Sequence, residues 1–296
     1  MPKNPELSVI ILNYNTKDLL EKCLVSLARV KNEVNFEVIV SDNGSRDGSL
    51  EMLNRDFKWV KVIKNSKNLG FAKGNNQARN TVKGEYVLFL NSDTQILPGT
   101  LAKSISYIDS RHRVGALTCK IVLPNGDLDK DTRRSFPIPW ISFTHFSGLD
   151  RLFPKSKFLA RYWYGYINPN VIHEIDVLQG AFFLVRKNVL DEVGWFDEDY
   201  FLDGEDVDLC WKIRERGWKI IYFPGVSVLH LKKATKDNLG INERRKYITL
   251  GVKSMEIFYR KHLWKRYPYL VNLLVLFGIR LMGIIRSLKV AFRLKI

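Results

Sequence analysis

Cysteine is scarce in this chain, and its scarcity argues against several classes of protein. The 296 residues include three cysteines, Cys23, Cys119 and Cys210, which lie far apart without the spacing of a metal or redox motif. We therefore expect neither a disulfide-stabilised scaffold nor a structural zinc site, and reduced thiols fit a cytosolic compartment. No long apolar run precedes the first expected strand, so we expect no ordinary signal peptide.

Acidic residues are scarce in the C-terminal part of the chain. The formal net charge is +16, from 47 Lys and Arg against 31 Asp and Glu. Between Leu231 and Ile296 there are sixteen basic and three acidic residues, so this tail alone carries +13. A basic tail fits nucleic acid, an anionic membrane surface or a solvated helix, and the sign of the charge does not choose among them.

The apolar residues of the tail favour a membrane surface. Basic residues recur at seven-residue steps from Lys246 to Arg260 with apolar residues between them, which predicts a basic amphipathic helix. Tyr269 to Ile279 is nearly all apolar, but a spanning helix would place Arg280 near mid-membrane at a cost of about 2.5 to 3.5 kcal/mol. We therefore expect peripheral, in-plane attachment to the cytosolic face of a membrane, without nucleic-acid binding. The alternative is that these helices simply pack on the rest of the protein.

Short apolar runs alternate with helical patterns in the first part of the chain. Each run has the length of a strand and is followed by a polar turn and by apolar residues at helical spacing. Three such units before a fourth strand predict an α/β fold with a doubly wound, mostly parallel sheet and helices on both faces. The expected strands are Leu7 to Leu12, Phe36 to Ser41, Val60 to Lys64 and Glu85 to Asn91.

Helices are expected between and after these strands. One contains Leu19 to Leu27, a second runs to Leu53 with Asp47 as a cap, and a third reaches about Thr81. A fourth begins at Pro98 and ends near Ser110.

The periodicity fails between Pro124 and Ile175, where prolines and many aromatic residues predict an irregular, substrate-facing segment. The remaining expected strands are Val114 to Leu123, Gln179 to Arg186 and Trp218 to Leu229, the last one either a strand pair or a bent strand that ends at His230. The remaining expected helices are Asn188 to Val193 and Phe201 to Arg216.

Three candidate site residues lie at the ends of separate elements. Asp93 follows a buried strand, Asp206 lies in the first turn of a helix, and His230 ends the last strand. A carboxylate and an imidazole are suitable ligands for Mg²⁺ or Mn²⁺ on a diphosphate, and a second carboxylate can act as a general base. Each also has a purely structural reading: a turn residue, a helix-dipole partner and a core histidine.

Five ordered motifs carry a family resemblance. The chain resembles the family 2 inverting glycosyltransferases of the GT-A fold, in particular their bacterial rhamnosyltransferase-like branch. The resemblance covers about Leu7 to His230. The motifs are Val-Ile-Ile-Leu-Asn-Tyr-Asn at 9–15, Val-Ser-Asp-Asn-Gly-Ser-Arg-Asp-Gly-Ser at 40–49, Asn-Leu-Gly-Phe-Ala-Lys-Gly-Asn-Asn at 68–76, Leu-Asn-Ser-Asp at 90–93 and Gly-Glu-Asp-Val-Asp-Leu at 204–209.

The resemblance implies a donor site for a nucleoside diphosphate sugar, UDP- or dTDP-linked. Asp42 would accept a hydrogen bond from the pyrimidine N–H, and Asp93 and His230 would bind the divalent metal, Mg²⁺ or Mn²⁺. The family's metal motif usually begins with an acid, whereas this chain has Asn91, which we expect to contact the donor or a metal-bound water. The donor-binding residues implied in full are Asn13, Tyr14, Asn15, Asp42, Asn68, Gly70, Phe71, Lys73, Asn91, Ser92 and Asp93.

The resemblance also implies an acceptor side with a catalytic base. Asp206 matches the base, and the preceding Glu205 would point about a quarter-turn away and support the start of the helix. Gly180 and Ala181 match the acceptor side. Arg133 and Arg134 could hold an anionic acceptor or close over the donor; solvated arginines are the alternative.

These inferences predict an inverting, metal-dependent glycosyltransferase that acts on a polysaccharide or lipid-linked glycan. Residues 1–230 would form the catalytic domain, with a nucleotide-sugar half at 1–123 and an acceptor half at 124–230, and 231–296 the membrane-associating tail. The alternatives are transfer directly to polyprenyl phosphate, or a non-catalytic relative that binds nucleotide sugars or polyanions.

Overall fold

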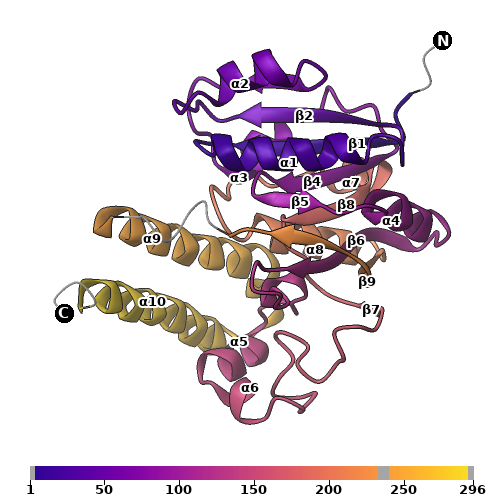
Figure 1. The fold of residues 1–296 in the computed structure, drawn as a ribbon. Helices are drawn as coiled ribbons and strands as arrows, with labels where there is room; N and C mark the ends of the chain where they lie inside the picture. Colours follow the sequence, from indigo (N-terminus) through magenta and orange to yellow (C-terminus); the bar gives the residue numbers. More distant parts are fainter. Residues whose placement is uncertain (1–3, 233–239, 293–296) are drawn as a thin grey trace.

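The computed structural model describes residues 4–232 and 240–292, and a large mixed sheet organises them (Figure 1). The strand order is β3-β2-β1-β4-β8-β6-β9-β5, and β7 pairs with β9 at the side. The strands are β1 Leu7–Asn13, β2 Phe36–Asp42, β3 Lys61–Lys64, β4 Tyr86–Asn91, β5 Thr94–Ile96, β6 Val114–Val122, β7 His173–Glu174, β8 Phe182–Arg186 and β9 Lys219–His230.

The first four strands form the parallel half that the sequence predicts. β1 lies between β2 and β4, and all its pairings are parallel. Val87, Leu88 and Phe89 in β4 are completely buried, because helices or loops cover both faces of the sheet here. Parallel strands end at the same edge of a sheet, so Asn13 lies opposite Asp42, and Asn91 lies opposite Leu12, one residue before Asn13.

The other half of the sheet mixes directions. β8 runs antiparallel to both β4 and β6, whereas β6 and β9 are parallel. The predicted bend in the last strand is confirmed: the register of β9 against β6 shifts between Phe223 and Ser227. The α/β class and the large sheet are therefore as predicted, but antiparallel pairings dominate beyond β4.

Helices cover both faces, and several boundaries differ from prediction. α2 has Gly48 rather than Asp47 as its N-cap and ends at Asp56, and α4 begins at Thr100 rather than Pro98. α3 ends at Asn76 rather than near Thr81, and α8 begins at Glu205 rather than Phe201, because Asp203 and Gly204 have positive φ angles of 63° and 92°. The helices are α1 Lys17–Arg29, α2 Ser49–Asp56, α3 Phe71–Asn76, α4 Thr100–Asp109, α5 Pro139–Phe146, α6 Leu149–Leu152, α7 Lys187–Val193, α8 Glu205–Glu215, α9 Ile241–Phe258 and α10 Tyr269–Phe292.

The expectation that Pro124 to Ile175 is irregular is partly wrong. α5 and α6 form within it, and Pro139 occupies the first turn of α5, where a proline needs no hydrogen-bond partner. His145 of α5 stacks on Tyr162 with ring centroids 4.2 Å apart and pairs with the buried Asp150 at 2.7 Å. The aromatic residues thus give this segment a small packed centre of its own.

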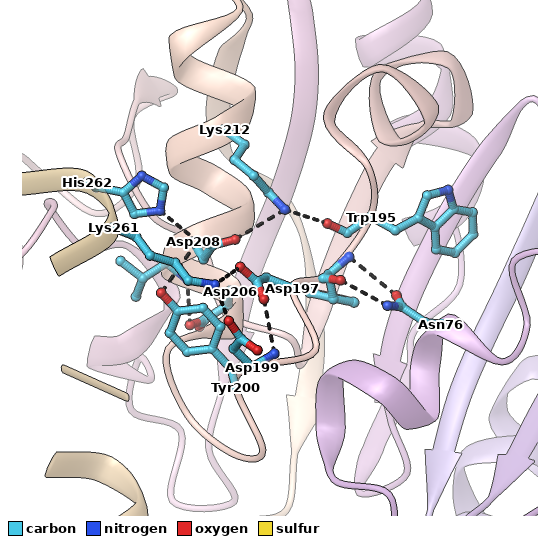
Figure 2. A network of polar contacts seen from close by, with 12 residues as sticks. Asn76, Trp195, Asp197, Asp199, Tyr200, Asp206, Asp208, Lys212, Lys261 and His262 are labelled. Carbon is cyan, nitrogen blue, oxygen red and sulfur yellow. Dashed lines mark hydrogen bonds and ion pairs between the residues drawn. The ribbon is translucent and has the colours of Figure 1, made fainter. Parts of the chain in front are cut away.

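The tail packs on helix α8. A π-helical turn at Tyr259–Leu263 follows α9 and contains Lys261 and His262, which contact α8 and the loop before it. Figure 2 shows His262 Nε2 facing Asp208 at 2.6 Å and Lys261 Nζ between two aspartates, 2.6 Å from Asp199. Phe258, Tyr259 and Leu263 are buried in the same contact.

The last helix is continuous through Arg280. The Arg280 guanidinium pairs with Glu256 of α9 at 2.8 Å, which holds the two tail helices together. Within the described residues one helix, Tyr269–Ala291, is long and apolar enough to cross a membrane, and only 17% of its most apolar window is buried.

His262→Ala should destabilise the protein. Asp208 is 1% exposed and would keep only Lys212, at 3.2 Å, and the Tyr200 hydroxyl at 3.4 Å as polar partners. We expect the free energy of unfolding in urea to fall by about 1 to 3 kcal/mol. His112→Ala, at an exposed position, is the matched control and should change it little. Equal midpoints for wild type and His262→Ala would show that the contact contributes nothing.

Candidate active site

Asp93 and His230 lie side by side because their strands pair. Thr94 of β5 pairs with His230 of β9 in an antiparallel register. Asp93 directly precedes Thr94, so its side chain lies beside that of His230. His230 Nε2 is 3.1 Å from Asp93 Oδ1, and the residues are 5% and 8% exposed. Two cis ligands of an octahedral ion with bonds of about 2.1 Å lie about 3.0 Å apart, so these atoms have the spacing of metal ligands.

Asp129 completes this corner, and the sequence analysis missed it. Its Oδ2 is 3.2 Å from His230 Nδ1 and accepts a hydrogen bond from Gln179 Nε2 at 3.0 Å. Lys232 Nζ donates to Oδ1 at 2.8 Å. A carboxylate behind a histidine fixes which ring nitrogen faces a metal. Nothing local distinguishes Asp129, because it lies in a polar turn 101 residues from its partner.

The protein itself offers few metal ligands. Within the described residues, no group of three or more His, Cys, Asp or Glu side chains could hold a metal ion. Asp93 and His230 therefore fit a divalent ion only if a diphosphate and water supply the other ligands, as Mg²⁺ commonly requires.

The loops at the ends of β1 and β2, which the sequence predicts to bind the nucleotide, are held by Asp42. Its Oδ2 accepts from Asn13 Nδ2 at 2.7 Å, and its Oδ1 accepts from the backbone N–H groups of Gly44 and Ser45. Asp42 is completely buried, so these contacts occupy most of its hydrogen-bonding capacity. Tyr14 is 46% exposed at the same edge, and Asn15, with φ of 54°, accepts from the Arg46 N–H.

The second predicted donor motif turns sharply at Gly70. Gly70 has a φ of 83°, and a Cβ there would lie 2.4 Å from the Phe201 carbonyl oxygen, so glycine is required. Asn68 Oδ1 accepts from the Gly70 N–H at 2.9 Å. Phe71 packs on Phe196, and Lys73 pairs with Glu198 at 3.2 Å. Asn68, Gly70 and Phe71 thus shape the turn.

Asn91 and Ser92, at the end of β4, lie close to the start of α1 and to the segment before β8. The Ser92 hydroxyl lies 2.9 Å from the Thr16 hydroxyl, at the start of α1. A Cβ on Gly180 would meet Phe71 at 2.9 Å and Asn91 Oδ1 at 3.7 Å. Gly180 therefore permits close approach between β4 and the segment before β8. Ala181 is completely buried in the core, and its side chain is not available to a ligand.

Asp206 faces Arg134. Arg134 Nη2 donates to Asp206 Oδ2 in a very short contact, and the two side chains are 16% and 12% exposed. Arg134 Nη2 also lies 3.4 Å from the Leu178 carbonyl oxygen. Arg133 points elsewhere: it contacts the Ile167 carbonyl oxygen and the Tyr222 ring, so the structure gives it no contact with Asp206.

Glu205 differs electrostatically from its neighbour. It is 7% exposed, and its Oε2 has no hydrogen-bond partner among the described residues. Burial, and then the adjacent Asp206 carboxylate, raise the pKa of Glu205 well above its ordinary value. The first turn of α8 thus contains an aspartate paired with an arginine and a glutamate whose burial favours its protonated form.

Three consecutive residues connect these parts. Leu178 contacts Arg134, Gln179 contacts Asp129, and Gly180 approaches Asn91. Adjacent Cα atoms are about 3.8 Å apart. The Arg134–Asp206 pair, the group of Asp93, His230 and Asp129, and the end of β4 therefore all lie next to one short segment.

His230 should make the metal-free protein less stable at alkaline pH. Burial alone would lower its pKa, but Asp129 and Asp93 outweigh that effect and raise the pKa to about 9 from 6.5. The stabilisation that protonated His230 gives the folded protein is therefore complete below pH 6.5 and is lost as the pH rises through 9. The free energy of unfolding should fall by about 3 kcal/mol over this range. Chemical denaturation in EDTA across this range measures it, and His230→Gln should remove that part of the pH dependence. A wild type and variant with parallel profiles would contradict the prediction.

Relatives with named activities share most of this chain. N-acetylglucosaminyl-diphospho-decaprenol L-rhamnosyltransferase of Mycobacterium tuberculosis is 28% identical over 237 residues, which cover 76% of this chain and 76% of the relative. Rhamnosyltransferase WbbL of Escherichia coli K12 is 25% identical over 237 residues, covering 75% and 82%.

Solved structures show the same fold at lower identity. The mannosyltransferase PcManGT from Pyrobaculum calidifontis, in complex with GDP-Man and Mn²⁺, superposes with a TM-score of 0.59 at 18% identity, covering 98% of this chain and 74% of that one. Staphylococcus aureus TarS with UDP-GlcNAc gives 0.53 at 20% identity, covering 84% and 66%. These neighbours confirm the expected GT-A fold.

The family described as Glycosyl transferase family 2 matches residues 8–194, more than half of the chain. Together with the two rhamnosyltransferases, this match confirms the resemblance drawn from the five motifs. The chain belongs to glycosyl transferase family 2, in its rhamnosyltransferase-like branch.

Proposed function

We propose that this glycosyltransferase is inverting and metal-dependent, and that it moves a sugar, with rhamnose the first candidate, from a UDP- or dTDP-sugar to a hydroxyl of a polysaccharide or lipid-linked glycan. The convergence of the Asp206 pair, the Asp93–His230 pair and the end of β4 on Leu178–Gly180 supports this proposal. A base on one side and a diphosphate-binding corner on the other are what in-line displacement needs.

Asp206 has the position of the general base. In the proposed reaction it takes the proton of the acceptor hydroxyl while that oxygen bonds to the anomeric carbon, and the bond to the diphosphate oxygen breaks on the opposite face. Such a base supplies about 10²- to 10⁴-fold. Arg134 keeps Asp206 oriented before the acceptor arrives.

The Asp93–His230 corner would hold the metal. A divalent ion there would neutralise charge on the departing diphosphate. Asp129 holds the His230 ring through Nδ1, which leaves Nε2 directed at Asp93 and at the ion's position.

The tail gives the proposed attachment to the cytosolic membrane face. Large apolar side chains of α10 are exposed, among them Leu270 at 73%, Leu274 at 70% and Phe277 at 65%. Arg280 lies near the middle of this helix and pairs with Glu256, which suits a helix lying in the interface.

Asp206→Asn should abolish transfer while leaving donor affinity within a fewfold. The assay follows nucleotide release from a panel of UDP-, dTDP- and GDP-sugars with Mn²⁺ or Mg²⁺ and acceptor, and we expect a loss of at least about 10²-fold. EDTA should abolish the wild-type signal.

Glu205→Gln is the matched control in the same helical turn. Burial and the Asp206 carboxylate raise the pKa of Glu205 and so favour its protonated form, which the isosteric amide mimics; Glu205→Gln should therefore lose much less transfer than Asp206→Asn does. Equal loss of donor binding and transfer in Asp206→Asn would reassign Asp206 to binding or folding. Release that survives chelation would reject the metal.

Replacing Leu270, Leu274 and Phe277 with serine should move the protein from the membrane fraction to the soluble fraction. The substitutions remove exposed apolar area and leave the buried Phe258, Leu263 and Leu276 intact, which a deletion of the tail would not. Fractionation of cell lysates measures the shift. High pH should extract the wild type if α10 lies in the plane; resistance to extraction would indicate that α10 spans.

A further inference from the structure

A second surface, remote in sequence from the tail, has the character of a membrane contact. We call it the 140–158 patch; its exposed large apolar residues are Trp140 at 41%, Phe143 at 57%, Phe146 at 50%, Leu152 at 72%, Phe153 at 53% and Phe158 at 66%. A contiguous group of this kind is unusual on a soluble surface and marks an interaction site.

The patch has a defined structure. The Trp140 ring lies 5.8 Å from Phe143 and 4.7 Å from Phe158 between centroids, and Trp140 Nε1 donates to the Phe158 carbonyl oxygen at 3.2 Å. These contacts join α5 to the loop after α6, so the rings are presented together.

Basic residues surround the apolar ones. Between Arg151 and Arg161 there are four basic residues and no acidic residue, and all four are exposed: Arg151, Lys155, Lys157 and Arg161. Among the described residues none of them forms a salt bridge with an acid. Apolar and aromatic side chains between lysines and arginines suit the interface of an anionic bilayer.

The patch adjoins the apolar helix of the tail. The Arg286 guanidinium of α10 lies 5.8 Å from the Phe146 ring centroid. Figure 1 shows α5 and α6 beside α10, at the opposite end of the molecule from α2. The 140–158 patch and helix α10 therefore lie next to each other at Phe146.

From these observations we propose that the 140–158 patch binds the anionic lipid surface together with α10. The net positive charge disfavours a second copy of this chain as the occupant, because like charges would face each other. The exposed rings disfavour a purely electrostatic polyanion site. This inference rests on the membrane attachment in the proposed function and adds a second, separately testable contact.

The contact would also orient the acceptor side. Tyr162 stacks on His145 of α5, and its carbonyl oxygen accepts from the Ser135 N–H at 2.8 Å, next to Arg134. The chain thus passes directly from the patch to the Arg134–Asp206 pair. A lipid-linked acceptor held at this membrane face would reach Asp206 from the side of the patch.

The test is binding of the full chain to sedimented vesicles of phosphatidylcholine, with and without phosphatidylglycerol. Each Lys or Arg near an anionic surface contributes about 1 kcal/mol, so Lys155→Glu/Lys157→Glu should weaken binding to the anionic vesicles by at least about tenfold. Phe153→Ser/Phe158→Ser should weaken binding to both kinds of vesicle.

Lys22→Glu/Lys58→Glu is the matched control, with the same change in net charge on exposed residues of the nucleotide half. It should retain nearly wild-type binding. Unchanged binding of the Lys155/Lys157 variant, or equal loss in the control, overturns the proposal. A double-stranded oligonucleotide that competes vesicles off the wild type also overturns it, in favour of a polyanion.

Donor hydrolysis in solution separates this inference from the proposed function. The patch residues do not contact Asp93, His230 or Asp206, so both patch variants should release nucleotide at the wild-type rate without vesicles. A vesicle-binding failure with normal hydrolysis concerns the patch alone; absent hydrolysis in the wild type concerns the proposed function.

Discussion

Burial of three carboxylates in one helical turn is the constraint around which the catalytic half is built. Glu205, Asp206 and Asp208 all lie in the first turn of α8 and are 7%, 9% and 1% exposed. Removing an ionised carboxylate from water costs several kcal/mol unless a partner compensates. Arg134 pairs with Asp206, and His262 and Lys212 pair with Asp208. At Glu205, burial raises the pKa, which favours the uncharged form of the side chain.

The pairings of Asp206 and Asp208 bring in different parts of the chain. Arg134 comes from the segment between β6 and β8, so the base requires that segment to be folded on α8. His262 comes from the π-helical turn after α9, so its contact with Asp208 fixes the tail to the same helix (Figure 2). The tail is thus a structural support of the helix that carries the proposed base, as well as the proposed membrane anchor. The two roles use different faces: Phe258 and Leu263 are buried, whereas Leu274 and Phe277 are exposed.

Elements that depend on neighbouring residues could be predicted from the sequence, whereas contacts between residues far apart in the chain could not. The strand β4 was predictable because its short, continuous apolar run is a local pattern. The direction of β8 was not, since its pairings with β4 and β6 depend on how the chain returns over a distance. Asp129 and His262 were missed for a similar reason: their partners lie 101 and 54 residues away, and no short pattern marks them. The predicted start of α8 was too early because Asp203, like Glu205 and Asp206, is an acid of the kind that favours a first helical turn. Asp203 in fact has a positive φ and lies before the helix.

The site combines strand ends that are held in register with residues from segments distant in the sequence. The ends of β1, β2 and β4 are fixed in register by backbone hydrogen bonds, and they hold the proposed nucleotide site. Arg134 and Asp129 combine both kinds of contact. Arg134 exchanges two backbone hydrogen bonds with Val177 and pairs with Asp206. Asp129 donates its N–H to the Ile121 carbonyl oxygen, and its carboxylate contacts Gln179, His230 and Lys232. The segment Val177–Gly180 therefore connects the end of β4 to both residues, since Val177 bonds Arg134, Gln179 bonds Asp129 and Gly180 approaches Asn91.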